Sequence, residues 1–263
     1  MLRVLAPNPG PFTLEGTNTW VVGEDPSIVI DPGPSDEAHT ESVAGQAGRG
    51  AVILLTHHHL DHAAGAAGLA RVTGAPILAF KPQADERALA GGQRVEAGGV
   101  VLRSMRTPGH SRDHVVFHEP ESGSLFTGDA VLGRGTTVVD PPDGDMADYM
   151  RSLESMLALA PRAIYPGHGP VVEAAAAKLR EYIEHRRMRE RQVLEALGEA
   201  GAPRSPAELV PAIYSAYPPE LHPAAARSVL AHLIKLEREG RVVRRGGSRE
   251  ERFIVHGDSI SSA

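Results

Sequence analysis

The sequence contains no cysteine. This absence excludes disulfide bonds, thiolate nucleophiles and sulfur-ligated metal sites, so any metal must be bound by nitrogen and oxygen atoms. Such donors are plentiful, because the 263 residues include 13 histidines and 33 aspartates and glutamates. The composition therefore permits a metal site built from imidazole and carboxylate ligands.

Long apolar runs are also absent. No window approaches the ~18 consecutive apolar residues of a membrane span, and residues 1–10 lack the uninterrupted apolar core of a secretory signal. We therefore expect a cytoplasmic protein that does not cross a membrane. A chain of 263 residues with 41% hydrophobic content can form one large domain, or one large and one small domain.

Aromatic residues make up only 4% of the sequence, which leaves few side chains to stack on nucleic-acid bases. The net charge of −6 is unevenly distributed. Residues 1–177 carry 12 lysines and arginines against 21 acids, whereas residues 178–263 carry 15 against 12. The mildly basic C-terminal part favours an anionic partner, although an ordinary solvated surface gives the same balance.

A cluster of histidines follows the apolar run at residues 51–55, which is typical of a buried strand ending in a loop. His57 and His59 can point the same way, because side chains alternate along a strand. Asp61 and His62 are adjacent, so the loop must turn for both to face inward. This pattern predicts two metal ions, the first bound by His57 and His59 and the second bound by Asp61 and His62. The alternative is a polar surface loop that happens to be rich in histidine.

Three later strand ends repeat this arrangement. His110 follows a Pro-Gly turn, Asp129 follows the strand and glycine at residues 124–128, and His168 follows another Pro-Gly. A lone histidine after Pro-Gly is ordinarily a surface residue, but the repetition favours a shared ligand site. Asp129 suits a bridging position, because a carboxylate can be shared between two cations and offsets their repulsion. For His114 we expect a structural or orienting role and no direct metal contact.

The rest of the N-terminal part predicts alternating elements, with strands at residues 16–23, 27–33, 75–80 and 100–105 and helices at residues 36–47 and 63–73. This order favours an α/β sandwich with helices on the outside. Asp31 ends the second strand, on the same edge as the histidine loop if the sheet is ordered sequentially. It either orients a histidine ligand or serves as a turn residue before Pro32.

The C-terminal part predicts a separate unit. Residues 173–201 have the pattern of one long helix, and helices beginning near Ser205 and Pro223 follow. Residues 241–245 and 252–255 then predict a hairpin, which completes a winged helix. Basic residues of this unit could reach phosphates: Arg227, Lys235, Arg238, Arg241, Arg244, Arg245 and Arg249. Acidic residues interrupt this basic surface, so the alternative of a packing or homodimerisation module stays open.

Four motifs in this order, His-x-His-x-Asp-His, Pro-Gly-His, Gly-Asp and Gly-His-Gly, resemble the metallo-β-lactamase superfamily over residues 1–172. Within it the chain is most similar to the β-lactamase-like protein 2 family, through residues 128–133 (GDAVLG), 135–138 (GTTV) and 165–170 (YPGHGP) and through the C-terminal region. The resemblance implies an αββα catalytic domain at residues 1–172, a connecting helix at 173–201 and a winged-helix domain at 202–263.

The resemblance also implies two zinc ions. The first would be bound by His57, His59 and His110, the second by Asp61, His62 and His168, and Asp129 would lie between them. Iron or manganese would also accept nitrogen and oxygen ligands. Leu60 and Ala63 occupy positions where relatives often carry polar or small residues, which affects the pocket and not the number of metals.

The chemistry expected of such a centre is hydrolysis. Two cations roughly 3.5–4 Å apart share a water and lower its pKa from near 16 towards 7, which supplies a bridging hydroxide as nucleophile. Asp61 and Asp129 are the expected catalytic carboxylates, with Asp61 taking a proton during attack.

The metal site does not specify the scissile bond. The resemblance favours single-stranded RNA cut internally, by an endoribonuclease. A small ester or thioester is the second hypothesis, as in the similar glyoxalase II group, whose different helical tail argues against it. A winged-helix regulator with a vestigial metal domain is the third, and seven intact ligands argue against that.

Overall fold

The computed structural model describes residues 1–216, 218–245 and 251–256. Contacts divide the chain into two compact units, each described here by itself. The first unit comprises residues 1–108, 113–137 and 152–180, and the second comprises residues 109–112, 138–151 and 181–263. The domain boundaries expected from the sequence, after residues 172 and 201, stay a prediction.

Two sheets form the first unit. The first sheet has the order β1 (Leu2–Leu5), β2 (Asn18–Val22), β3 (Ile28–Ile30), β4 (Val52–Leu54), β5 (Ile77–Ala79) and β6 (Arg87–Ala88). The second has the order β11 (Ala163–Pro166), β10 (Ser124–Gly128), β9 (Val115–Glu119), β8 (Val100–Arg106) and β7 (Arg94–Ala97). Strands β3 to β6 are parallel neighbours, as are β10 and β11, whereas the remaining pairs are antiparallel.

The core of the first unit lies on both faces of the first sheet. All five residues of β2 are buried, because Val21 packs in the cluster with the helices while Trp20 and Val22 pack in the cluster between the sheets. A strand covered on both faces has apolar residues in succession and not in alternation. The second sheet contributes Val95, Leu102, Val115, Phe117 and Phe126 to the inner cluster.

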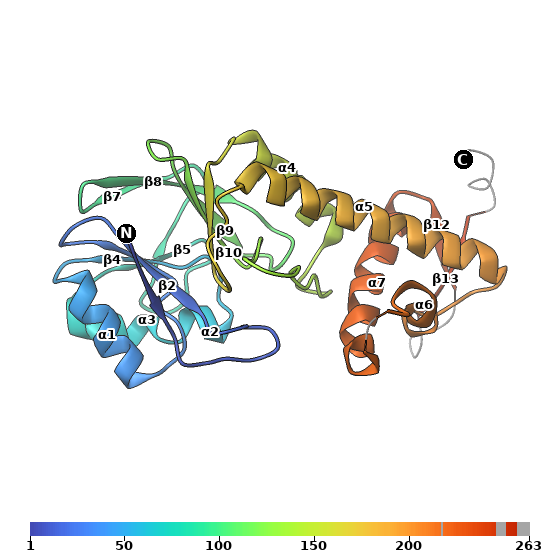
Figure 1. Ribbon diagram of the computed structural model, residues 1–263, viewed down its shortest axis with the longest axis horizontal. Coiled ribbons are helices and arrows are strands. Elements are labelled where there is room, and N and C mark those ends of the chain that lie inside the picture. The colour runs from blue at the N-terminus through green and yellow to red at the C-terminus, as the bar shows by residue number, and fades with distance from the viewer. Residues whose placement is uncertain (217, 246–250, 257–263) are drawn as a thin grey trace. The chain divides into compact units, whose positions relative to one another are not determined.

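Helices complete the layers. Helices α1 (Glu37–Ala47), α2 (Leu60–Ala63) and α3 (Ala66–Thr73) lie beside the first sheet (Figure 1). Residues 152–158 of α4 (Met146–Ala158) and 175–180 of α5 (Ala175–Ala200) belong to the first unit. The predicted αββα sandwich is confirmed, with strands β1, β6, β7 and β9 added to it.

The predicted helix over residues 63–73 is wrong in its extent. Helix α3 begins at Ala66, and a turn at residues 64–65 separates it from α2, which ends at Ala63. A Cβ at Gly65 would lie 2.9 Å from the carbonyl oxygen of Pro34 and 3.0 Å from that of Pro32, and its N–H donates to the carbonyl of Gly33 at 2.9 Å. The backbone of the preceding turn therefore packs directly on this glycine, and the histidine loop continues into α2.

The second unit contains the winged helix. Its described elements are the C-terminal part of α5, α6 (Pro206–Ile213), a short 3-10 helix (Pro219–Leu221), α7 (His222–Arg238) and the hairpin of β12 (Val242–Arg245) and β13 (Arg252–Val255). Ser205 caps α6 in a capping box with Glu208. The hairpin tip at residues 246–250, including Arg249, lies outside the described residues. Among the helices that are described, none is both long and apolar enough to cross a membrane.

Candidate metal centre

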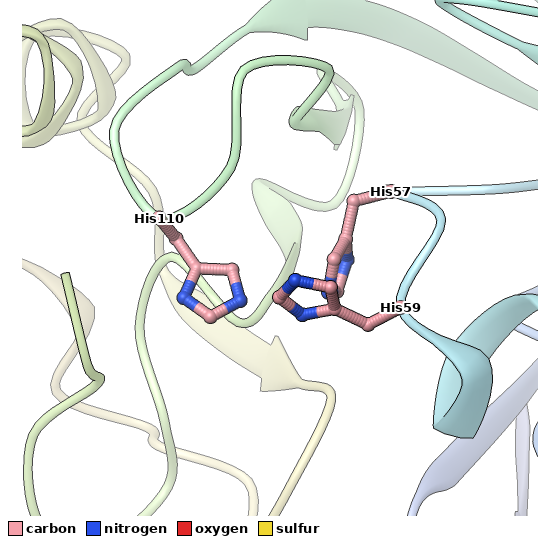
Figure 2. Close-up of side chains that lie close together, drawn as sticks. All are labelled: His57, His59 and His110. Carbon is pink, nitrogen blue, oxygen red and sulfur yellow. The ribbon is translucent and has the colours of Figure 1, made fainter. Parts of the chain in front are cut away.

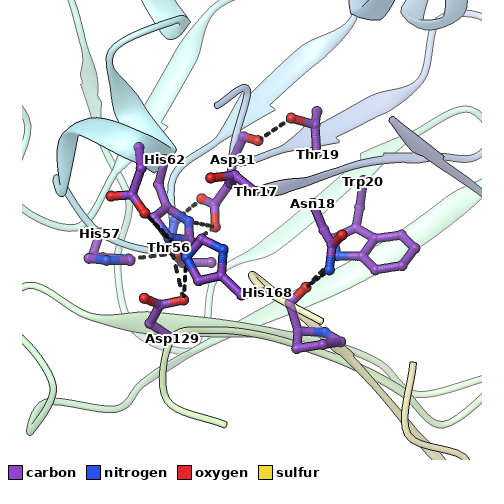
Figure 3. Close-up of polar contacts among 12 residues, drawn as sticks. Thr17, Asn18, Thr19, Trp20, Asp31, Thr56, His57, His62, Asp129 and His168 are labelled. Carbon is purple, nitrogen blue, oxygen red and sulfur yellow. Dashed lines mark hydrogen bonds and ion pairs between the residues drawn. The ribbon is translucent and has the colours of Figure 1, made fainter. Parts of the chain in front are cut away.

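The carboxylate of Asp31 links the ends of two strands. Because β3 and β4 are parallel neighbours, Asp31 and Thr56 leave the sheet at the same edge (Figure 3). The Thr56 N–H donates to Asp31 Oδ1 at 2.8 Å, and the Thr56 hydroxyl donates to Oδ2 at 2.7 Å. His62 Nδ1 lies 2.9 Å from the same Oδ2. Of the two roles considered for Asp31, the geometry favours orientation of a histidine.

The second sheet brings two further groups to the same centre. Asp129 and His168 follow the parallel neighbours β10 and β11, so they too leave their sheet at one edge. Gly167 allows the close approach, since a Cβ there would lie 2.6 Å from His62 Cε1 and 2.7 Å from Asp129 Oδ1. No larger residue fits at this position without moving a neighbour.

The ligand atoms of four side chains lie close together, and three of these side chains, His62, Asp129 and His168, are labelled in Figure 3. His168 Nε2 lies 3.2 Å from His62 Nε2, 3.2 Å from Asp61 Oδ2 and 3.4 Å from Asp129 Oδ1. His62 Nε2 lies 3.3 Å from Asp129 Oδ1 and 3.5 Å from Asp61 Oδ2. Ligand atoms at about 2.0–2.1 Å from one tetrahedral zinc ion lie roughly 3.4 Å apart. The spacing therefore fits a metal ion.

All seven predicted residues occur in groups whose donor atoms lie within 4.8 Å of one another. These groups are His57, His59 and His110 (Figure 2); His57, His62 and Asp129; and Asp61, His62 and His168. Because the middle group shares a histidine with each of the others, the arrangement fits two adjacent cations and not two separate sites. Nitrogen and oxygen donors of this kind suit zinc, iron or manganese.

Four of the five histidines present the same nitrogen to the centre. Their Nδ1 atoms face oxygens: Asp31 Oδ2 for His62, Gly16 O at 3.2 Å for His168, Val138 O at 2.8 Å for His110, and Thr56 Oγ1 at 2.9 Å for His57. Carboxylate and carbonyl oxygens only accept, and the Thr56 hydroxyl hydrogen is given to Asp31, so each Nδ1 carries the proton. Nε2 is thereby the nitrogen available to bind a metal.

The electrostatics of the centre favour positive charge. Burial alone would lower the pKa of His168, but hydrogen bonds with Asp129 and Asp61 raise it to about 9. The pKa of the buried His62 is also raised, against the cost of burial, by Asp129 and Asp31. The histidines in turn lower the pKa values of Asp129 and Asp61, although burial acts in the opposite direction. A cation bound here would displace the histidine protons.

Sequence reasoning missed two groups around the loop. The first is the Thr56 hydroxyl, which lies between Asp31 and His57. In the sequence, only the position of Thr56 at the end of a strand could have indicated this role. His58 lies between Asp113 and Glu86, at 2.6 Å from Asp113 Oδ2 and 2.8 Å from Glu86 Oε2. The hydrogen bond with Asp113, then that with Glu86, raises the pKa of His58 to about 9 against its burial.

His114 lies beside the centre without joining it. Its ring stacks on that of His57 at 5.1 Å between centroids, and its Nδ1 lies 2.9 Å from the Thr107 hydroxyl. In the described part of the chain it belongs to no group of candidate metal ligands. The geometry therefore fits the structural role expected of it.

Known proteins share this architecture. The Metallo-beta-lactamase superfamily profile matches residues 12–88 and 78–168, and that of the Beta-lactamase associated winged helix domain matches residues 205–250. The chain is 38% identical to the β-lactamase-like protein 2 homologue of Drosophila melanogaster, over 97% of this chain and 94% of that protein. It is 37% identical to the atrochrysone carboxyl ACP thioesterase of Aspergillus fumigatus, over 84% of this chain and 75% of that protein.

A solved structure extends the likeness to the fold. A metallo-β-lactamase family protein of Thermus thermophilus superposes with a TM-score of 0.80 at 22% identity, over 97% of this chain and 98% of that one. The resemblance inferred from the four motifs is confirmed. The chain belongs to the metallo-β-lactamase superfamily, as a metal-dependent hydrolase with a C-terminal winged helix.

Proposed function

We propose that this hydrolase acts on thioesters of apolar acyl groups, through two zinc ions held by the seven predicted residues. The observation that carries the choice of substrate is the apolar surface beside the metal ligands. Leu60 lies between His59 and Asp61 in the chain and is 78% exposed, the largest exposed fraction among the large hydrophobic residues that the structure describes. An acyl chain would cover it, whereas a phosphodiester backbone would not.

A second apolar residue, Leu14, lies close to the residue that follows His168. Leu14 Cδ1 would be 3.1 Å from a Cβ at Gly169, the residue after His168. Since His168 and Asp61 are 3.2 Å apart, Leu14 and Leu60 each lie next to one of two touching ligands. An apolar substituent bound between the two leucines would place its ester carbon at the metals.

The loop that carries Leu14 is held in place by its own hydrogen bonds. The N–H of Leu14 donates to Gly10 O at 2.9 Å, the N–H of Gly10 donates back at 3.1 Å, and Thr13 Oγ1 donates to Asn8 O at 2.6 Å. Phe12 at the tip is 67% exposed. A prefolded loop loses little entropy on binding, which favours it as a recognition surface.

The cations of the C-terminal part are largely neutralised. In the second unit, Arg227 pairs with Asp140 and Arg238 pairs with Asp145. Lys235 lies 2.8 Å from both Glu190 and Glu239, and Arg244 pairs with two glutamates. Pairing of this kind weakens the positive field that an RNA backbone requires. The relative named as an acyl-carrier thioesterase supports the same choice.

The seven ligands would divide between the two cations. His57, His59 and His110 would hold one cation, Asp61, His62 and His168 the other, and Asp129 would lie between them. Bound cations supply water activation near neutral pH and stabilise negative charge on the carbonyl oxygen. The side chain of Asp61 is 29% exposed against 12% for Asp129, so we assign to Asp61 the proton lost by the water.

The test compares substrates on one preparation. Zinc-loaded protein is incubated with acetyl-, octanoyl- and lauroyl-thioesters, with S-lactoylglutathione and with labelled single-stranded RNA. We expect thioester cleavage that rises with acyl length, loss of most turnover in Asp129→Ala, and normal turnover in the surface control Asp148→Ala. Elemental analysis of the purified protein identifies the metal. Cleavage of RNA without cleavage of any thioester refutes the proposal.

Single-stranded RNA, the substrate that the family resemblance favours, is placed second here and is supported by the excess of 15 basic over 12 acidic residues in positions 178–263. If a phosphate backbone binds there, affinity falls steeply as salt increases. An affinity for RNA that is unchanged between 50 and 200 mM salt, roughly the range over which phosphate contacts are lost, excludes this role.

A further inference from the structure

His58 is the residue between two candidate ligands, His57 and His59, yet its ring faces away from the metal donors. Its Nδ1 lies 2.6 Å from Asp113 Oδ2, and its Nε2 lies 2.8 Å from Glu86 Oε2. The backbone N–H of His58 donates to the same Asp113 oxygen at 3.1 Å. Because both ring nitrogens face carboxylate oxygens, both carry hydrogen.

The three side chains come from segments far apart in the sequence. Glu86 lies 28 residues after His58, just before β6, and Asp113 lies 55 residues after it, just before β9. Glu86 Oε2 also accepts from the N–H of Gln83 at 2.8 Å, which fixes that carboxylate in its own turn. The histidine loop is therefore tied to two distant segments, and the Glu86 carboxylate is itself held by its own turn.

The bonds lie mostly out of solvent. The side chains of His58, Asp113 and Glu86 are 15%, 15% and 13% exposed. Charge-assisted hydrogen bonds at this depth are stronger and more directional than exposed ion pairs. Loss of the imidazole would leave two carboxylates without this partner, which is costly where water is scarce.

We propose that His58 is a positioning residue: by bridging Asp113 and Glu86, it fixes the loop on which His57 and His59 bind the first metal. A loop residue free to rotate would carry both neighbours with it, and metal ligands tolerate displacements of only about 0.2 Å. The proposal rests on the two-metal assignment and not on the choice of substrate.

The experiment measures zinc affinity by stepwise competition with a chelator. His59→Ala and His168→Ala first identify which step belongs to which group of ligands. We expect His58→Leu to weaken the step assigned to His57, His59 and His110 by about 10- to 100-fold, the usual effect of removing a partner around a ligand. The zinc affinity of the other step should stay within about threefold of the wild-type value. The variant His58→Arg, which keeps donors for both carboxylates, should restore part of the lost affinity.

Glu86→Gln and Asp113→Asn test the same clamp from its other members and keep the experiment informative if His58→Leu does not fold. His118→Gln is the matched control, a partly buried histidine of β9 in the same unit. A variant that lowers the melting temperature but leaves both zinc steps unchanged shows a merely structural role and overturns the proposal.

Hydrogen exchange in metal-free protein separates this proposal from the metal assignment. We expect faster exchange over residues 57–63 in His58→Leu and Asp113→Asn, and no change in His118→Gln. If the wild-type chain binds no zinc while exchange rises in this loop alone, the metal assignment fails and the clamp stands. If exchange in the loop does not change, the clamp is refuted whatever the zinc affinity.

Discussion

Gly167→Ala tests whether close backbone packing sets the ligand spacing. Gly167 does not adopt a positive φ, so alanine is compatible with its backbone. The added Cβ would nevertheless lie 2.6 Å from His62 Cε1 and 2.7 Å from Asp129 Oδ1, where ordinary contact begins near 3.4 Å. One methyl group therefore pushes on two ligands at once while changing nothing in the donor set.

The size of the effect follows from these distances. The His62 ring or the Asp129 carboxylate must move by roughly 0.8 Å to restore normal contact, several times the ~0.2 Å tolerance of a metal–ligand distance. Disturbing the surroundings of a ligand typically costs 10- to 100-fold in affinity, or about 1.4–2.7 kcal/mol. We expect a loss at the upper end of this range, because both residues are displaced.

The assay is chelator competition on Gly167→Ala, with Gly45→Ala as the control. Gly45 lies within α1, and no atom outside its immediate surroundings lies within 4 Å of an added Cβ. That control should keep wild-type zinc affinity and gain about 1 kcal/mol of stability from the helix preference for alanine. If Gly167→Ala binds zinc as tightly as Gly45→Ala, the spacing is not set by this glycine and the argument is wrong.

Four further results are expected. Asp31→Asn, which removes the charge that orients His62, should weaken zinc binding about 10- to 100-fold in the same chelator assay, with little change in far-UV circular dichroism. In acid, the free energy of unfolding should fall by about 3 kcal/mol as pH drops from 6.5 to 4, because burial and then Arg186 and Arg189 lower the pKa of His185 to about 4, so the unfolded chain takes up the proton first. A similar loss of unfolding free energy should follow between pH 4.5 and 2, because hydrogen bonds from His232 and Lys235 overcome burial and lower the pKa of Glu190 to about 2. Urea unfolding at each pH measures the two acid losses. A free energy of unfolding that does not change with pH contradicts these two predictions. Ser205→Ala should lose about 1 kcal/mol by removing the cap of α6, seen as a lower urea midpoint at unchanged slope.

The sequence was sufficient to predict the edge at which the site forms. Asp31, His57, Asp129 and His168 each follow a short apolar run, and parallel neighbours necessarily end at the same edge of a sheet. The alternation of elements predicted an α/β sandwich with helices on the outside, and the family resemblance implied the αββα order of its layers. Residue type and place along the chain were therefore enough to collect the candidate ligands.

The contacts that hold the ligands could not be predicted in this way. The close packing of the Pro32 and Pro34 carbonyls on Gly65, in the turn between α2 and α3, joins segments about 30 residues apart and leaves no mark in the local pattern. Strand β6 is two exposed residues with no periodicity to detect. The partners of His58 lie 28 and 55 residues away, and nothing in the local pattern distinguishes them from surface acids.

The charge of the metal centre explains why the residues beside the ligands, and not the ligands themselves, must determine which substrate is cleaved. Two divalent cations beside Asp61, Asp129 and Asp31 would leave a net charge of about one positive, which would stabilise the negative charge that develops on oxygen during attack at either a carbonyl or a phosphodiester. The ligands alone therefore cannot separate the two reactions. Discrimination then depends on what lies next to them, and Leu60→Ser should reduce cleavage of lauroyl thioester far more than of acetyl thioester. Equal losses for both would mean that this surface does not contact the acyl chain.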